Sequence, residues 1–403
     1  MRRFGKALLV VGTVLLGLAA VAWLVVPSVA VKYPGGSLDK TAVATGTFTL
    51  YVDPATAAPR KPAQQLPLRI ERRLQVVQNS SSRSVVNEDD AEFIGPLPRQ
   101  DFEQRYIVDR SNVRNVNDAR AFAYTPGNGI DRSPNYSINL PFHAGKGPYP
   151  VWKNETGSAY DFTRVGTLTR NGVKLARYHG RLTDAAVQDY YIAQLARQGI
   201  PQQLSPAQAA AQLKAAGADP AVLTAAVLPR LQPADRAAIT AILAAPVPLN
   251  YRLDVDTNFL VEPRTGAIVG LERIDQTLRA RPDIQAIGRL EAILVQPAYA
   301  GDPVVAAAAS TVRQLVAKPP ETPVFRIEYG QTAASVDDLV AFADSRGDRI
   351  TLVTKTVPAV LGIVGTLLIL VGLLLVFRNP RPGPSVDVSD RSGTSPPRSP
   401  SNV

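Results

Sequence analysis

Two long uncharged stretches, one near each end of the chain, place the strongest constraint on what this sequence can fold into. Residues 7–31 are 25 consecutive positions without a charged side chain, and residues 356–377 are another 22. A helix needs about 20 apolar residues to cross the roughly 30 Å hydrocarbon core of a bilayer. Both stretches are long enough, so the sequence predicts two transmembrane helices around a large central region.

The segments that flank the two stretches predict their orientation. Residues 1–6 and the tail 378–403 are short and basic, and such segments stay on the cytoplasmic side of a membrane. We therefore expect a two-pass protein of a bacterial plasma membrane, with both termini cytoplasmic and residues 32–355 outside. The tail is rich in Pro, Ser and Arg and is predicted to be disordered. The flanking basic residues are Arg2, Arg3, Lys6 and Arg378.

The first stretch has an alternative interpretation as a cleaved signal peptide. Ser28, Val29 and Ala30 form a small-x-small sequence of the kind that signal peptidases cut. The apolar region of a secretory signal usually has about 7–15 residues, however, and this stretch is longer. The length favours a retained anchor.

Composition excludes several classes of function for the central region. The chain carries a net charge of +10, about half of it in the two tails, and it has no cysteine and only two histidines. Nucleic-acid binding, thiolate metal sites and disulfides therefore receive no support. No Walker loop, zinc-protease helix or hydrolase elbow is present. We expect neither an enzyme nor a cofactor.

Two acidic groups have the composition of a metal site. Asp254 and Asp256 lie on the polar side of an alternating strand, where exposed carboxylates are usual. The run Asn87 to Asp90 is predicted to be a polar loop, since it lacks the ligand spacing and central glycine of a calcium-binding loop. Neither group predicts a metal site.

Period-two patterns predict a sheet. Residues 66–76 alternate apolar and polar side chains, and so do residues 251–261. Residues 262–266 (EPRTG) then supply a turn, and residues 267–278 return as the second strand of a hairpin. The strands that can be identified in this way are few and interrupted by charges.

A different pattern separates the strands. Residues 183–245 are rich in alanine and are predicted to be a helical insertion that starts at Thr183–Asp184. Another helix is predicted to begin at Ser335 and stop at Gly347. Strands and helices that occupy separate blocks favour an α+β domain with a mostly antiparallel sheet.

Three segments resemble an actinobacterial family of two-span envelope proteins, the PorA-type porins. They are residues 46–54 (GTFTLYVDP), residues 136–152 (from YSINLPF to YPVW) and residues 261–269 (VEPRTGAIV). Together with the spans, the resemblance covers most of the chain outside the alanine-rich block. It implies an envelope location and a two-span topology, and it leaves the activity open.

Aromatic residues gather in one Gly/Pro-rich stretch, where they form either a platform for lipid or glycan or part of the core. These candidate ligand-binding residues are Tyr136, Phe142, Tyr149, Trp152 and Tyr160. Small residues in the spans could pack one span against the other or against a second copy. The candidates are Thr13, Gly17, Gly362 and Thr366, with Trp23 as an anchor at the membrane surface.

Three functions follow from these patterns. The preferred one is a non-enzymatic envelope protein whose external domain binds a lipid, a cell-wall polymer or a protein partner. The second is an oligomeric channel, since two helices cannot enclose a pore and few strands are available for a barrel. The third is a hydrolase or transferase that uses carboxylates alone.

Overall fold

The structure is a computed structural model that describes residues 2–25, 31–33, 37–53, 59–215 and 217–378. It separates into two compact units. One unit contains the terminal helices, and the other extends from Ala30 to Thr351. The second unit combines helices with one large antiparallel sheet, so the predicted α+β class is confirmed.

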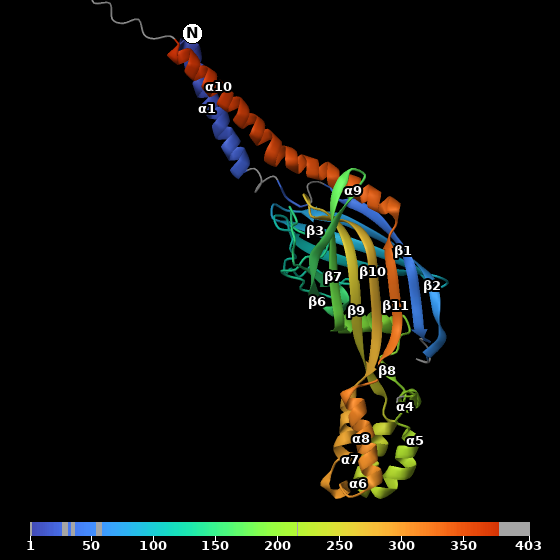
Figure 1. The fold of residues 1–403 in the computed structure, drawn as a ribbon. Helices are drawn as coiled ribbons and strands as arrows, with labels where there is room; N and C mark the ends of the chain where they lie inside the picture. The colour runs from blue at the N-terminus through green and yellow to red at the C-terminus, as the bar shows by residue number, and fades with distance from the viewer. Residues whose placement is uncertain (1, 26–30, 34–36, 54–58, 216, 379–403) are drawn as a thin grey trace, which may run out of the picture. The chain divides into compact units, whose positions relative to one another are not determined.

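The terminal unit is an antiparallel pair of helices, α1 (Arg2–Leu24) and α10 (Val357–Phe377) (Figure 1). Both are long and apolar enough to cross a membrane. Small residues seven positions apart face the partner helix, with Gly5 against Gly372 and Gly12 against Gly365. A Cβ atom on Gly12 would lie 2.7 Å from the Gly365 carbonyl oxygen, so the two backbones approach as only glycines allow.

The small residues that were predicted from the sequence to pack the spans together make few contacts between the helices. Ala19 approaches Gly362, whereas Gly17 has no neighbour within 4 Å among the described residues. The hydroxyls of Thr13 and Thr366 donate to carbonyls of their own helices, and both side chains are exposed. Contact between the spans therefore follows the glycines at seven-residue spacing, and the neighbouring faces remain uncovered.

Within the described residues, the second unit is built on an 11-stranded sheet in which every strand pairing is antiparallel. The expectation of few strands is therefore wrong. Charged side chains do not interrupt these strands, because they alternate with buried ones across both faces. The order is β4-β3-β2-β1-β11-β10-β9-β7-β6-β5, with β8 paired to β9. The strands are β1 (Asp39–Val52), β2 (Pro59–Asn79), β3 (Arg83–Ile94), β4 (Gln100–Asp109), β5 (Tyr149–Lys153), β6 (Ser158–Arg170), β7 (Val173–Ala186), β8 (Gln203–Leu204), β9 (Val247–Glu262), β10 (Ala267–Pro282) and β11 (Thr322–Gln331).

The sheet curls until its two ends meet (Figure 1). Val86 and Tyr106 from one end share a buried apolar cluster with Phe162 and Tyr178 from the other. Asn154, just after β5, donates a hydrogen bond to the side chain of Gln104 in β4. We call the concave side the inner face. A second apolar cluster covers another part of it, from β1 and β2 to β9–β11.

In the part of the chain that the structure describes, a single helix covers the convex side of the sheet, which is called the outer face here. Helix α9 (Ala333–Thr351) packs Val336 and Val340 against Leu175 and Leu260. The prediction that this helix stops at Gly347 is wrong, because a π-helical turn, Leu352–Thr356, leads on into α10. Gly347 instead leaves space for the Arg264 guanidinium, which pairs with Asp344 and Asp348 on the same helix.

The alanine-rich block is helical, but its predicted start is wrong. Residues 183–186 still belong to β7, because Asp184 pairs with Arg281 and Arg279 instead of capping a helix. Two blocks of helices bury a shared apolar core that contains Ile239, Leu294 and Val305. The helices of this region are α3 (Asp189–Arg197), α4 (Pro206–Ala215), α5 (Pro220–Val222), α6 (Pro233–Ala244), α7 (Ile284–Leu294) and α8 (Pro303–Ala317).

Candidate functional site

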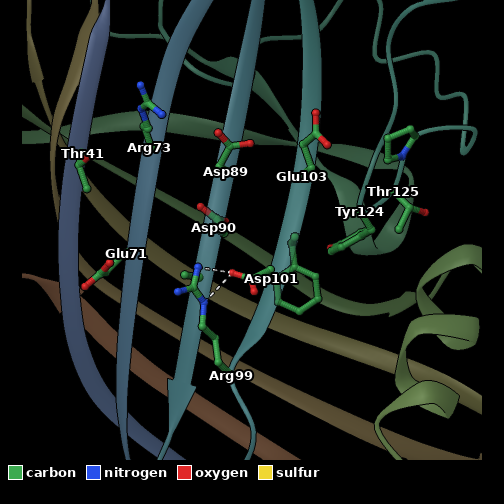
Figure 2. Close-up of a pocket in the computed structure, with 13 residues that line it drawn as sticks. Thr41, Glu71, Arg73, Asp89, Asp90, Arg99, Asp101, Glu103, Tyr124 and Thr125 are labelled. Carbon is green, nitrogen blue, oxygen red and sulfur yellow. Dashed lines mark hydrogen bonds and ion pairs between the residues drawn. The ribbon is translucent and has the colours of Figure 1, made fainter.

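An open acidic pocket of about 530 Å³ lies over β1–β4 (Figure 2). The strand register places four outer-face residues side by side on neighbouring strands, in the order Thr41, Arg73, Asp89 and Glu103. Figure 2 shows Arg73, Asp89 and Glu103 on neighbouring strands, with Arg99 bound to Asp101 below them. The pocket is lined by Thr41, Glu71, Arg73, Asp89, Asp90, Ala91, Arg99, Asp101, Phe102, Glu103, Tyr124, Thr125 and Pro126.

Most charged side chains of this pocket form ion pairs. Arg73 donates two hydrogen bonds of 2.7 Å to Asp39, which lower the pKa of Asp39. Arg99 and Asp101 form a pair in which both side chains are more than half exposed. Such exposed pairs contribute little to stability. No group of three or more side chains arranged to bind a metal occurs within the described residues. The pocket can attract cations only weakly.

The inner face of the same strands holds a charged network. Arg72 donates to both carboxylate oxygens of Asp90, at 2.8 and 2.9 Å, and its Nε lies 3.3 Å from Glu88. Glu88 and Asp90 are almost fully buried, whereas 36% of the Arg72 side chain is exposed. The inner face is therefore solvent-accessible beside Arg72, although apolar clusters fill it elsewhere.

Two carboxyl groups of this network are held partly protonated near neutral pH. Burial raises the pKa of Glu88 from 4.5 to about 7, against the opposing charge of Arg72. Burial also raises the pKa of Glu92 to about 7, and the charge of Asp90 adds to the effect. Glu92 has no hydrogen-bond or ion-pair partner within the part of the chain that the structure describes.

Three tyrosine rings converge on the same region from separate elements. Tyr124 follows β4, Tyr191 belongs to α3, and Tyr329 belongs to β11. The centroids of the Tyr124 and Tyr191 rings lie 5.3 Å apart. Burial raises the pKa of all three hydroxyls, and Glu92 adds to this effect, although the charge of Arg72 opposes it at Tyr329; the hydroxyls therefore remain neutral. None of these hydroxyls has a hydrogen-bond partner among the described residues.

Small residues on β1 separate the charged strands from Tyr329. Ala42, Ala44 and Gly46 occupy successive inner-face positions between β2 and β11. A Cβ atom on Gly46 would lie 2.6 Å from the Cβ of Tyr329. Ala42 and Ala44 are themselves buried, and Leu68 and Ile70 of β2 lie beside these positions on the inner face. We call Arg72, Glu92, Tyr124, Tyr191 and Tyr329 together the inner site.

A buried arginine positions the loop that carries Tyr124. Arg132 donates to the Phe122 and Arg105 carbonyls, each at 2.9 Å, and to Asn154 at 2.8 Å. Its guanidinium also lies 4.4 Å from the centroid of the Tyr106 ring. Since only 2% of Arg132 is exposed, it ties the loop after β4 to the turn after β5. Tyr124 itself has a φ of 66°, a conformation that this tethering maintains.

The aromatic residues predicted to bind a ligand lie beside the inner site. Tyr136 is buried in an apolar cluster, and Phe142, Tyr149 and Tyr160 pack against that cluster. Tyr136 and Tyr149 meet edge to face at 5.8 Å, and the Tyr160 hydroxyl bonds to Thr257. Trp152 is half-buried on edge strand β5, and its indole nitrogen is buried without a partner among the described atoms.

Sequence reasoning missed the inner site, and the prediction of a loop at Asn87–Asp90 is wrong. These residues lie inside β3, where they alternate between the two faces. A signal was present, because Val86, Glu88, Asp90 and Glu92 continue a period of two. The charges concealed it, since inward carboxylates are expected only with an inward cation, and Arg72 lies on another strand.

Comparison with known proteins returns one family. The family model described as Porin PorA matches residues 4–374, which is nearly the whole chain and includes both apolar helices. The resemblance found in three segments of the sequence is thereby confirmed over nearly the whole chain. No curated protein matches the sequence.

Proposed function

This chain belongs to the PorA porin family, and from that premise we propose that it is a two-pass envelope protein whose sheet domain binds a ligand on its inner face. The helix pair is the membrane anchor in this proposal. Because α1 and α10 are antiparallel, both termini lie on the same side of the membrane, and the basic tails favour the cytoplasmic side. Residues 32–355 then lie outside.

The outer face argues against a pore formed by the sheet of a single chain. A barrel embedded in lipid needs an apolar outer band, and each charged side chain at mid-bilayer costs about 2–4 kcal/mol. The outer face of β2–β4 instead presents Arg73, Asp89 and Glu103 in one row. Apolar side chains also fill both parts of the inner face beside the inner site. These features support a sheet domain that lies in water.

One observation carries the binding function. The inner site contains a carboxyl group and three phenolic hydroxyls without protein partners, on the sheltered side of an otherwise well-packed sheet. None of these four groups is among the described side-chain atoms that are buried without a partner, so they are accessible to solvent and available to a ligand. The carboxylates of Asp90 and Glu155 nearby are engaged by Arg72 and Lys153, which favours a binding function over an enzymatic one.

Native mass spectrometry of the full-length protein, purified from its own membranes in a mild detergent, tests this function. We expect a small molecule to copurify at a fixed stoichiometry and to be lost from a Tyr191→Ala, Tyr329→Ala double variant. The outer-face variant Glu71→Gln is the matched control and should retain the molecule. A wild-type protein that carries no bound molecule, under conditions that preserve its fold, would contradict the proposal.

An oligomeric channel is the second candidate, and the family match favours it. Two helices cannot enclose water, so conduction would require several copies. The uncovered faces of α1 and α10, which include Gly17 and Thr366, are available for such contacts. Planar-bilayer recordings would support this candidate if full-length protein conducts and a variant with a disrupted helix face does not. Equal currents from protein-free controls would eliminate it.

A further inference from the structure

Three basic side chains stand at the sequence ends of the second unit, next to the segments that lead to the helix pair. Lys32 lies just after the start of this unit, and Arg346 and Arg349 lie just before its end. Arg110 lies beside the first of them, because its Nε donates a 2.8 Å hydrogen bond to the Tyr33 carbonyl. We call Lys32, Arg110, Arg346 and Arg349 together the basic rim.

Hydrogen bonds bring the members of the basic rim to one end of the sheet. Lys32 donates to the Ser81 carbonyl, in the turn between β2 and β3, at 3.0 Å. Arg346 donates to the Ser37 carbonyl, just before β1. The start of β1 pairs with the end of β2, so both attachments lie at the same end of these strands. Arg349 follows Arg346 by three residues in α9 and therefore shares its side of the helix.

The basic rim keeps its positive charge. None of its four members has an ion-pair partner within the part of the chain that the structure describes. The neighbouring carboxylates are engaged elsewhere, since Asp344 and Asp348 pair with Arg264. Asp109 accepts hydrogen bonds from the loop that follows it. An anion that reaches the rim therefore meets cations that no protein group has neutralised.

Two guanidinium groups of the basic rim are held in place and retain free donors. Arg110 also donates to the Ser80 carbonyl, at 2.6 Å. The guanidinium of Arg346 lies 4.2 Å from the centroid of the Phe342 ring. The remaining N–H groups of both arginines are not among the described atoms that are buried without a partner, so solvent reaches them. A planar fork of such donors matches the oxygens of a phosphate group.

Chain connectivity keeps the basic rim near the surface of any membrane that the helix pair crosses. Arg349 and Val357, the first residue of α10, lie in one continuous helix and are eight residues apart. This spacing corresponds to about 12 Å of helix. Headgroups occupy about 5–8 Å of that distance, and the attraction of anionic lipids extends about a further 8 Å into solution. Arg349 is therefore within reach of the headgroups at any inclination of the helix.

From this arrangement we propose that the basic rim binds the phosphate groups of anionic lipids at the membrane surface. The inference goes beyond the proposed ligand of the inner face and uses no residue of the inner site. It rests only on the proposed membrane anchor. A zwitterionic headgroup carries its own ammonium group beside the phosphate, so the rim should favour a lipid with a net negative charge.

Native mass spectrometry of the full-length protein, released from nanodiscs, tests the proposal. The nanodiscs contain equal amounts of phosphatidylglycerol and phosphatidylcholine with the same acyl chains, and the measured quantity is the ratio of the two lipids that stay bound. We expect phosphatidylglycerol to be enriched. The basic tails contribute to this enrichment in every variant, so the comparison between variants carries the test.

The test variant is Lys32→Gln, Arg349→Gln, which removes two cations of the basic rim. Each cation near a membrane surface favours anionic lipid about fivefold, so we expect the enrichment to fall at least about fivefold. The matched control is Arg289→Gln, Lys318→Gln. It removes the same charge from exposed positions beside α7 and α8, which β11 separates from α9. The control should keep the wild-type enrichment, and circular dichroism should be the same for all three proteins.

Two results would overturn the proposal. One is equal enrichment in the test variant and the control, which would mean that the basic rim is not a lipid site. The other is loss of the bound lipid from the wild-type protein when inorganic phosphate is added at millimolar concentration, which would assign the rim to a free anion.

The failure of this proposal is distinguishable from the failure of the proposed function. A protein that inserts into nanodiscs without enrichment that depends on the basic rim would overturn the lipid site alone. The membrane anchor and the inner-face ligand would then stand. A protein that does not insert into nanodiscs would overturn the anchor.

Discussion

Strands β2 and β3 place the same kinds of side chain on opposite faces of one sheet, with opposite consequences. Arg73 and Asp89 point outward into an open pocket, while their neighbours Arg72 and Asp90 point inward. The outward pairs are screened by water and contribute little. The inward pair is surrounded by protein, and the burial of the neighbouring Glu88 and Glu92 carboxyl groups raises their pKa. Strand alternation alone therefore assigns one face to solvent and the other to a site.

The largest expected difference between the two faces is in stability. Arg72→Met leaves Glu88 and Asp90, each with 7% side-chain exposure, without their cation. Removal of one partner from a buried pair costs about 3–5 kcal/mol, and we expect the lower end because Arg72 is partly exposed. Arg73→Met should leave the thermal unfolding midpoint unchanged. Thermal unfolding of both full-length variants in detergent measures this difference in stability. Equal unfolding midpoints for the two variants would contradict the prediction.

The helix pair shows a similar contrast between a contact face and an uncovered face. Gly12→Leu would place side-chain atoms on the Gly365 backbone, which lies 2.7 Å from an added Cβ. Overpacking of this kind costs typically about 1–3 kcal/mol. Gly17→Leu has no neighbour within 4 Å to displace and should be tolerated. The resistance of each variant to unfolding in a denaturing detergent measures this difference in stability. Unfolding of Gly17→Leu under conditions in which Gly12→Leu stays folded would contradict the prediction.

The inner carboxyls predict how stability depends on pH. Their pKa is about 7 in the folded protein and 4.5 as the ordinary value. Between these values the folded protein holds protons that the unfolded chain has released, so stability falls as pH rises from 4.5 to about 7. With partial exposure of Glu92 taken into account, its share is on the order of 1–2 kcal/mol. Glu92→Gln should flatten the dependence and Glu71→Gln should not, as unfolding midpoints across this range will show.

The smallest expected effect separates stability from binding. The Tyr124 hydroxyl has no partner among the described residues, so Tyr124→Phe should change the free energy of unfolding by less than about 0.5 kcal/mol. Its ring would remain in place, so this variant should still retain the molecule that copurifies with the wild-type protein. A large loss of stability in this variant would mean that the hydroxyl is bonded within the fold.

Local patterns predicted the parts of this fold that depend on neighbours in sequence. The hairpin of β9 and β10, with its turn at residues 262–266, was predicted from alternation and turn residues. The pairing of β1 with β11 and the closure of the sheet at Asn154 depend on residues far apart in the chain, which no local pattern encodes. The inner site depends on that closure, because it draws Glu92, Tyr191 and Tyr329 from three distant segments.

The same limit explains the errors at two boundaries. Asp184 has the chemistry of a helix cap, yet Arg279 and Arg281 from β10 bind it in an extended strand. Gly347 has the conformational freedom of a helix stop, yet it accommodates Arg264 from the β9–β10 turn. In both positions a partner distant in sequence overrides the local preference.

Cysteine accessibility tests the central claim most directly, because the natural chain contains no cysteine to interfere. Glu71→Cys places a thiol on the outer face and Glu92→Cys places one at the inner site. On intact cells treated with a membrane-impermeant maleimide, the account predicts rapid labelling at position 71 and slow labelling at position 92. Equal rates at the two positions, or no labelling at either until the membrane is broken, would contradict it.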